Sequence, residues 1–216
     1  MAYDLEEQER LDELKAFWSR WGNWITLGLT LVLLVIAGWR GWGWWELRQA
    51  GAASAIHEKM DDALRRAQLI EAAPMAATLM NEYSRTPYAA MAALRVARAQ
   101  LDAGDSKSAR TTLTWAVEHG QDPGIQAVAR IRLAGLLLDE GLADRAQLDA
   151  GLKLLDGPPP AEMAGAWIDR RADLLAELGR GDEARAAWTE ALSKLDSNSP
   201  LRPLVQLKLD TFGAGS

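Results

Sequence analysis

The chain has 216 residues, of which 49% are hydrophobic and 25% charged, as is typical of a folded protein. Cysteine is absent, which excludes disulfides, thiolate metal sites and cysteine nucleophiles, and two histidines are too few for a histidine-based metal cage. The net charge of −6 argues against nucleic acid as the main partner.

Seven of the ten tryptophans lie between residues 18 and 45. No side chain from Trp21 to Trp39 is ionisable, and these 19 residues span roughly 28 Å as a helix, close to the thickness of a bilayer core. Because indole prefers the headgroup boundary, Trp21, Trp24, Trp39 and Trp42 are expected at the two membrane interfaces. The sequence predicts an acidic tail over residues 1–20 and a transmembrane anchor over residues 21–45.

Two alternatives to an uncleaved anchor are less consistent with this segment. A buried helix of a soluble protein would not need tryptophans at both ends. A cleavable signal peptide could end at Ala50-Gly51-Ala52, but its N-terminal region would be acidic and its apolar run unusually long. Charge does not fix the orientation, because three nearby cations flank each end; they are Arg10, Lys15 and Arg20, then Arg40, Arg48 and Lys59. The short tail before a large C-terminal part only slightly favours an N-terminus inside.

Residues 46–216 have helical rather than alternating hydrophobic spacing, so we expect an all-α fold. Gly104, Gly141 and Gly179 are 37 and 38 residues apart and share neighbours in register. Alanines stand seven residues before each glycine (Ala97, Ala134, Ala172) and five after it (Ala109, Ala146, Ala184). Each glycine would end the first helix of a hairpin in a left-handed conformation, and the alanines would let the paired helices pack closely. The pattern predicts a solenoid like that of tetratricopeptide repeats (TPR), with the second unit the least regular because Lys153 replaces a small residue.

Further elements flank the three units. Residues 46–70 and 74–85 are expected to form a long and a short helix, and residues 200–212 a terminal helix that caps the solenoid. We expect Trp115, Trp167 and Trp188 to pack in the core or between repeats.

No catalytic motif is present, so neither enzymatic activity nor a cofactor is expected. His57 is interpreted as part of a solvated helix face, and His119 as a cation at a helix end. The repeat register instead suggests a groove for extended peptides or partner helices, lined by Arg98, Asp102, Asp139, Asp173 and Glu177. In that groove Asp102, Asp139 and Glu177 would form an acidic ladder, unless they are simply solvated carboxylates.

Several segments, in this order, resemble one protein family. They are Gly38-Trp39-Arg40-Gly41-Trp42 in the anchor, the stretch from Pro87 to Ala97, the stretch from Gly181 to Trp188, and Leu207-Lys208-Leu209. Together with the acidic tail and total length, they make the chain similar to the ancillary SecYEG translocon subunit family (YfgM-type proteins of Gram-negative bacteria). The resemblance covers nearly the whole chain.

The resemblance implies a single-pass inner-membrane protein of type II topology, with a cytoplasmic N-terminus and residues 46–216 in the periplasm. It also implies partners, namely the SecYEG translocon and a membrane-anchored PpiD-type prolyl isomerase, and a non-enzymatic adaptor role in chaperone handling of translocated proteins. One alternative is a tethered TPR scaffold for envelope assembly or division. Another is a periplasmic enzyme with an unrecognised site, which would require a deep polar pocket with titratable groups close together.

Overall fold

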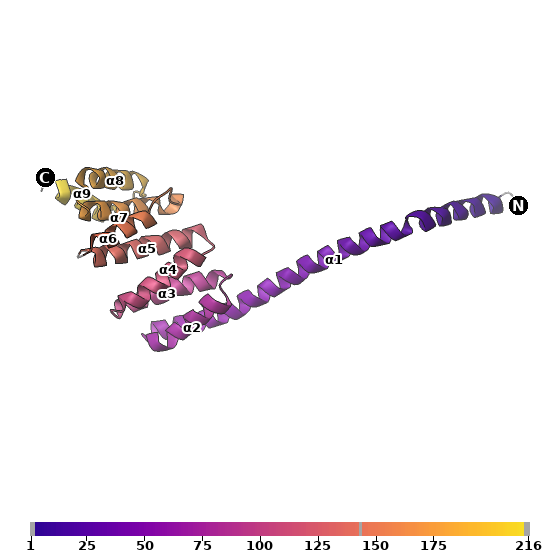
Figure 1. Cartoon of the computed structure of the whole chain (residues 1–216), viewed down its shortest axis with the longest axis horizontal. Coiled ribbons are helices and arrows are strands. Elements are labelled where there is room, and N and C mark those ends of the chain that lie inside the picture. The colour runs from indigo at the N-terminus through magenta and orange to yellow at the C-terminus, as the bar shows by residue number, and fades with distance from the viewer. Residues whose placement is uncertain (1–2, 143, 214–216) are drawn as a thin grey trace. The chain divides into compact units, whose positions relative to one another are not determined.

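The regular elements of the computed structural model, which describes residues 3–142 and 144–213, are all helices (Figure 1). This confirms the predicted all-α class. The α-helices are α1 (Tyr3–Arg65), α2 (Leu69–Glu82), α3 (Pro87–Asp102), α4 (Ser106–His119), α5 (Pro123–Gly141), α6 (Arg145–Leu154), α7 (Ala164–Glu177), α8 (Gly181–Lys194) and α9 (Arg202–Gly213). A short 3-10 helix, η1 (Ala161–Met163), precedes α7. The chain divides into two compact units, residues 1–49 and 50–216.

In the N-terminal unit, α1 from Lys15 onward is long and apolar enough to cross a membrane. Its large apolar side chains are exposed, and the four predicted interface tryptophans expose from 53% of their surface at Trp21 to 81% at Trp39. The threonine hydroxyls inside the apolar run, at Thr26 and Thr30, each donate to a backbone carbonyl one turn earlier at 2.8 Å. The helix therefore leaves neither hydroxyl hydrogen unpaired toward lipid. That the tryptophans lie at membrane interfaces stays a prediction.

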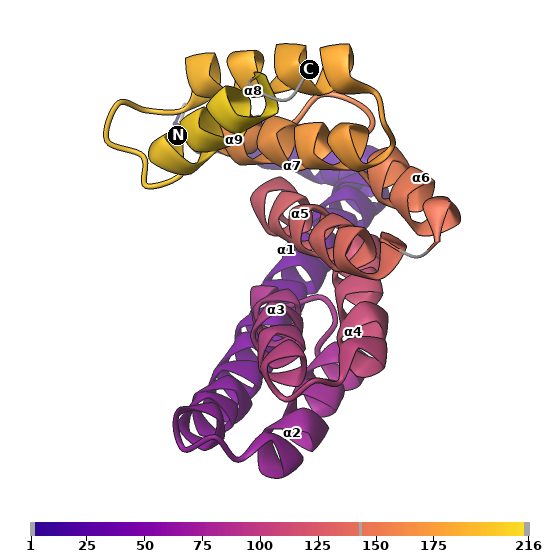
Figure 2. The same cartoon turned by 90° about the vertical axis from the view of Figure 1, so that its left-hand side faces the viewer.

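The three predicted repeats are the hairpins α3–α4, α5–α6 and α7–α8 (Figure 2). Two of the aligned glycines end their first helix as expected, with a φ of 80° at Gly104 and 76° at Gly179. Gly141 also ends its helix, but its φ is not positive, so the prediction of a left-handed conformation was wrong there. Gly141 is needed for a close approach instead, because a Cβ atom would lie 2.6 Å from Leu148 Cδ2. In the same unit Ala146 is exposed rather than packed, consistent with an irregular second repeat.

A fourth hairpin precedes these three, formed by the end of α1 and α2. Its turn contains Ala67, whose φ of 57° is left-handed. Gln68 N–H donates to the Ala63 carbonyl at 2.9 Å, and Asp105 and Arg180 make the same bond after Gly104 and Gly179. Ala67 lies 37 residues before Gly104, so it occupies the glycine position of an earlier repeat unit.

The predicted break between residues 70 and 74 lies instead at residues 66–68. Pro74 is inside α2 and leaves the carbonyl of Ile70 without its helical donor. Ile70 is 92% exposed, so water can satisfy that carbonyl. A proline inside the helix, beyond its first turn, is therefore tolerated here.

Alanines make up about half of the buried hydrophobic residues that the structure describes. The predicted packing of three tryptophans is confirmed. Trp115 contacts both the core cluster of α1, α2 and α3 and the core cluster of α3, α4 and α5, while Trp167 and Trp188 belong to the C-terminal cluster. The indole N–H of Trp167 donates to the Leu155 carbonyl at 3.0 Å, so its burial leaves no unpaired donor.

The predicted terminal helix is α9. Its Val205 is fully buried, and Phe212 meets Trp188 edge-on with ring centroids 5.3 Å apart. The Arg202 guanidinium donates to the carbonyls of Leu192 and Leu195 at 2.8 and 2.9 Å, which pairs two acceptors at the end of α8. This helix thereby covers the open end of the last hairpin.

Candidate functional site

The first helices of the hairpins present equivalent positions on one face of the stack. Figure 2 shows α3, α5 and α7 following one another through it, and α3 contacts α5, which contacts α7. We call this the first-helix face. The groove residues predicted from the sequence all belong to these helices.

The α3–α5 pocket is a cavity of about 270 Å³ on this face. Its polar lining consists of three arginines and one carboxylate: Arg98, Arg132, Arg170 and Asp139. Its remaining walls are apolar, with Ala97, Leu101, Leu113, Ile131, Gly135 and Leu136. The pocket is therefore cationic, where the sequence interpretation stressed carboxylates.

Each of these guanidiniums has a different partner. Arg98 Nε lies 3.0 Å from Asp102 Oδ1, Arg132 Nη1 donates to the Leu94 carbonyl at 3.0 Å, and Arg170 Nη1 lies 3.3 Å from Asp173 Oδ2. Burial, and then the neighbouring charge of Arg98, lower the pKa of the Arg132 guanidinium. Two cations that line the pocket thus lie close enough to repel each other.

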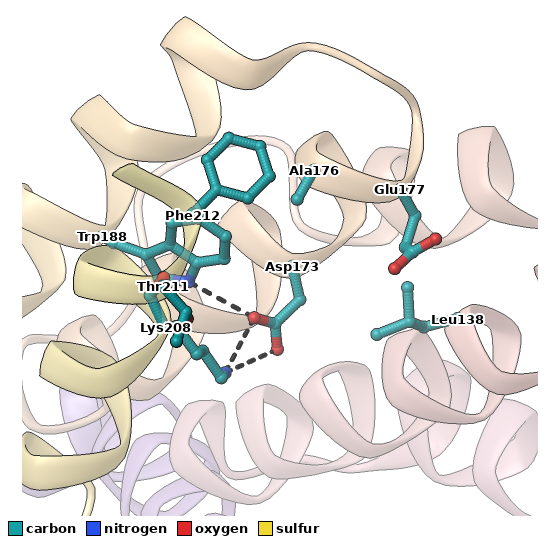
Figure 3. Close-up of a pocket in the computed structure, with 8 residues that line it drawn as sticks. All are labelled: Leu138, Asp173, Ala176, Glu177, Trp188, Lys208, Thr211 and Phe212. Atoms are coloured by element: carbon teal, nitrogen blue, oxygen red, sulfur yellow. Dashed lines mark hydrogen bonds and ion pairs between the residues drawn. The ribbon is translucent and has the colours of Figure 1, made fainter. Parts of the chain in front are cut away.

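The α7–α9 pocket, of about 440 Å³, has a different character (Figure 3). Asp173, Glu177 and Lys208 are its charged lining residues. Lys208 Nζ lies 2.8 Å from Asp169 Oδ1 and 2.7 Å from Asp173 Oδ1, and the Trp188 indole N–H donates to Asp173 at 3.3 Å. One lysine on α9 therefore binds two carboxylates on α7.

This cluster fastens α9 to α7. Burial and then the charge of Asp169 raise the pKa of Asp173, and Lys208 and Arg170 oppose the shift. The Thr211 hydroxyl, the nearest candidate nucleophile, donates to the Leu207 carbonyl at 2.7 Å. Asp173 and Lys208 in this pocket are thus engaged with each other. Among the side chains that the structure describes, no group of three His, Cys, Asp or Glu is arranged to hold a metal.

The structure places four of the five predicted groove residues in the two pockets. Arg98 and Asp139 line the α3–α5 pocket, and Asp173 and Glu177 line the α7–α9 pocket. Asp102 pairs with Arg98 and lines neither. Their role in partner binding stays a prediction.

Sequence reasoning missed Arg132, Arg170 and Lys208. Two of them were detectable, because Arg95, Arg132 and Arg170 recur 37 and 38 residues apart, in the register of the glycines. Each reaches toward the preceding hairpin: Arg95 Nε lies 2.9 Å from Asp61 Oδ1, and the Arg170 guanidinium carbon would lie 3.4 Å from a Cβ atom on Gly135. Lys208 had no such signal.

The two histidines differ from each other. The interpretation of His57 as solvated was wrong: its side chain is only 14% exposed and packs against Tyr88, with ring centroids 5.6 Å apart. The end of α1 packs against Tyr88 of α3, and this contact covers the helix face that carries His57. His119 does lie at the end of α4, as predicted, and its Nδ1 is 3.1 Å from the Trp115 carbonyl oxygen; its role as a cation there stays a prediction.

Comparison with known proteins gives consistent relatives along the whole chain. The family model of the tetratricopeptide repeat-like domain matches residues 15–214. The ancillary SecYEG translocon subunit of Neisseria gonorrhoeae is 31% identical, over 98% of this chain and 100% of its own length. Its namesake in Escherichia coli is 27% identical over 95% and 96%, and that of Haemophilus influenzae is 26% identical over 98% and 100%.

Proposed function

Because this chain belongs to the tetratricopeptide repeat-like family and to the family of ancillary SecYEG translocon subunits, we propose that it is a non-enzymatic, membrane-anchored adaptor at the SecYEG translocon. The observation that carries this proposal is the match over nearly the full length of the relatives, so that anchor and repeats are both included. In this role the anchor confines the repeats to the membrane plane, which raises their effective concentration near the channel. The first-helix face then binds polypeptide without chemistry.

The finer proposal concerns clients and partners. The adaptor would receive proteins that leave the translocon, together with a membrane-anchored PpiD-type prolyl isomerase, and assist chaperones in handling them. Two observations support the proposal that the first-helix face holds extended polypeptide segments: this face carries two pockets, and α9 covers the end of the last hairpin.

We also propose type II topology, with residues 1–20 cytoplasmic, 21–45 in the membrane and 46–216 periplasmic. The absence of cysteine makes this directly testable. Ser19→Cys and Ser197→Cys place single thiols at exposed positions on either side of the anchor. A membrane-impermeant maleimide should label Ser197→Cys in intact spheroplasts and Ser19→Cys only after lysis; the reverse pattern would contradict the topology.

The domain boundary has its own test. A truncated protein that lacks residues 1–45 should remain soluble and give the circular dichroism minima of an α-helical protein, since Met60 and Leu79 in its first hairpin are fully buried within the retained unit. Aggregation, or a spectrum without those minima, would contradict an independently folded repeat domain.

Photo-crosslinking in native membranes tests the function itself. A benzoylphenylalanine at Asp139, on the first-helix face, is compared with one at Glu190, exposed on α8. We expect crosslinks to SecY, SecE, SecG or a membrane-anchored prolyl isomerase from position 139 and not from position 190, identified by mass spectrometry. Division or outer-membrane assembly proteins in their place would instead favour the tethered scaffold.

A further inference from the structure

Three arginines from three different helices converge on the α3–α5 pocket. Arg98 comes from α3, Arg132 from α5 and Arg170 from α7, and Asp139 is the only carboxylate among the described lining residues. The Arg170 guanidinium packs against Gly135, with its carbon 3.4 Å from the position that a Cβ atom would take. The pocket is thus assembled by the repeat stacking and not by one helix.

The positive charge of this pocket is only partly compensated within the chain. The hydrogen bond that the structure gives Arg132 goes to a neutral carbonyl, that of Leu94. Arg170 shares its carboxylate partner, Asp173, with Lys208, and its Nε is buried without a hydrogen-bond partner. Arg98 is paired, but 71% of its side chain is exposed and it can reorient. The guanidiniums therefore retain donors for an external acceptor.

We propose that the α3–α5 pocket binds carboxylate side chains of an extended acidic peptide segment in a client or partner protein. Guanidinium forks pair with carboxylates in a bidentate manner, and the apolar walls suit the neighbouring residues of such a segment. The carboxylates of the adjacent α7–α9 pocket, Asp173 and Glu177, disfavour a second acidic residue there, so the segment has a defined position along the first-helix face. This inference rests on the proposed function and specifies which polypeptide segments the adaptor selects.

Binding can be measured on the full-length protein in phosphatidylcholine nanodiscs. The probe is a fluorescein-labelled peptide of repeated Ser-Glu-Leu units, and its control has Ser-Gln-Leu units. By fluorescence anisotropy, the glutamate peptide should bind more tightly than the glutamine peptide by about tenfold or more, with an affinity that falls as salt rises. Equal affinities for both peptides would overturn the proposal.

A matched pair of variants assigns the binding to this pocket. Arg132→Gln and Arg145→Gln each remove one charge and one guanidinium bond to a carbonyl of another hairpin, to Leu94 at 3.0 Å and Leu178 at 3.1 Å. Only Arg132 lines the pocket, so only its variant should weaken glutamate-peptide binding, by about fivefold. Equal losses in both variants would overturn the assignment.

Two further measurements keep the result clear if Arg132→Gln folds poorly. Asp139→Asn alters an exposed residue and removes the one lining carboxylate, so it should strengthen binding about twofold to fivefold. Vesicles containing phosphatidylglycerol should not compete with the peptide; full competition would assign the pocket to anionic lipid instead. Translocon crosslinking from position 139 is scored separately. Equal affinities for the glutamate and glutamine peptides, together with crosslinks to the translocon, would refute this inference and leave the proposed function standing.

Discussion

Replacing Lys208 by methionine should destabilise the repeats substantially. Methionine keeps much of the packing volume but removes the cation from Asp169 and Asp173, whose side chains are 6% and 12% exposed. Removing one partner of a buried ion pair typically costs 3–5 kcal/mol because it leaves a buried charge unpaired. Lys208 is itself 24% exposed, and Asp173 keeps Arg170, so we expect roughly 2–4 kcal/mol here.

Thermal unfolding of the full chain in non-ionic detergent, followed by circular dichroism, measures this effect. For a domain of this size it corresponds to a decrease in Tm of about 5–12 °C. Lys59→Met is the control, because Lys59 is an exposed lysine in the interior of α1 and its loss should change Tm by no more than about 2 °C. If both variants melted within that range of the parent, the attachment of α9 through this ion pair would be refuted.

Three further predictions concern the Asp173 carboxyl group, two left-handed turn residues and the close approach at Gly141. Burial raises the pKa of Asp173 above its unfolded value, so its ionised form disfavours folding at neutral pH. Losing Lys208 raises that pKa further, so the stability deficit of Lys208→Met should shrink as the pH falls from neutral and Asp173 becomes protonated, whereas a constant deficit would contradict this. Ala67→Gly should stabilise the protein by about 0.5–1 kcal/mol and Gly104→Ala should destabilise it by about 1 kcal/mol, since both residues are left-handed and no atom lies within 4 Å of a Cβ at Gly104; urea unfolding curves with unchanged midpoints would argue against backbone strain. Gly141→Ala should cost about 1–3 kcal/mol in the same assay by crowding Leu148, although its φ is ordinary, and a neutral result would mean that the α5–α6 hairpin repacks freely.

Much of the fold could be predicted because the same residue pattern recurs in each of the three repeats. Gly104 and Gly179 mark turns where left-handed backbone favours glycine, and their spacing reveals the hairpins. The two helices of the first hairpin were expected, but their place in the repeat register was missed because Ala67 adopts that conformation without being glycine. The surrounding contacts impose it at an energetic cost that the sequence does not display. Ala72, at the alanine position of the same register and fully buried, was the remaining signal.

The candidate site was less predictable, since it depends on contacts between hairpins. Asp102, Asp139 and Glu177 were aligned by register, but an aligned carboxylate does not reveal its partners. The register of Arg132 and Arg170 was visible, yet their convergence on one pocket depends on how α7 packs against α5, where the Arg170 guanidinium lies beside Gly135. The position of Lys208 depends on how α9 packs against α7, and no periodicity specifies that packing.

The arginines of the register have a consequence for the order of assembly. Arg95 pairs with Asp61 of α1, Arg132 donates to a carbonyl of α3, and Arg170 packs against Gly135 of α5. An arginine of each hairpin therefore contacts the hairpin synthesised before it. A chain that leaves a ribosome or a channel N-terminus first can therefore fold one hairpin at a time, each on a completed template. In such a sequence of events α9 follows the hairpin that it covers and closes the final interface through Lys208.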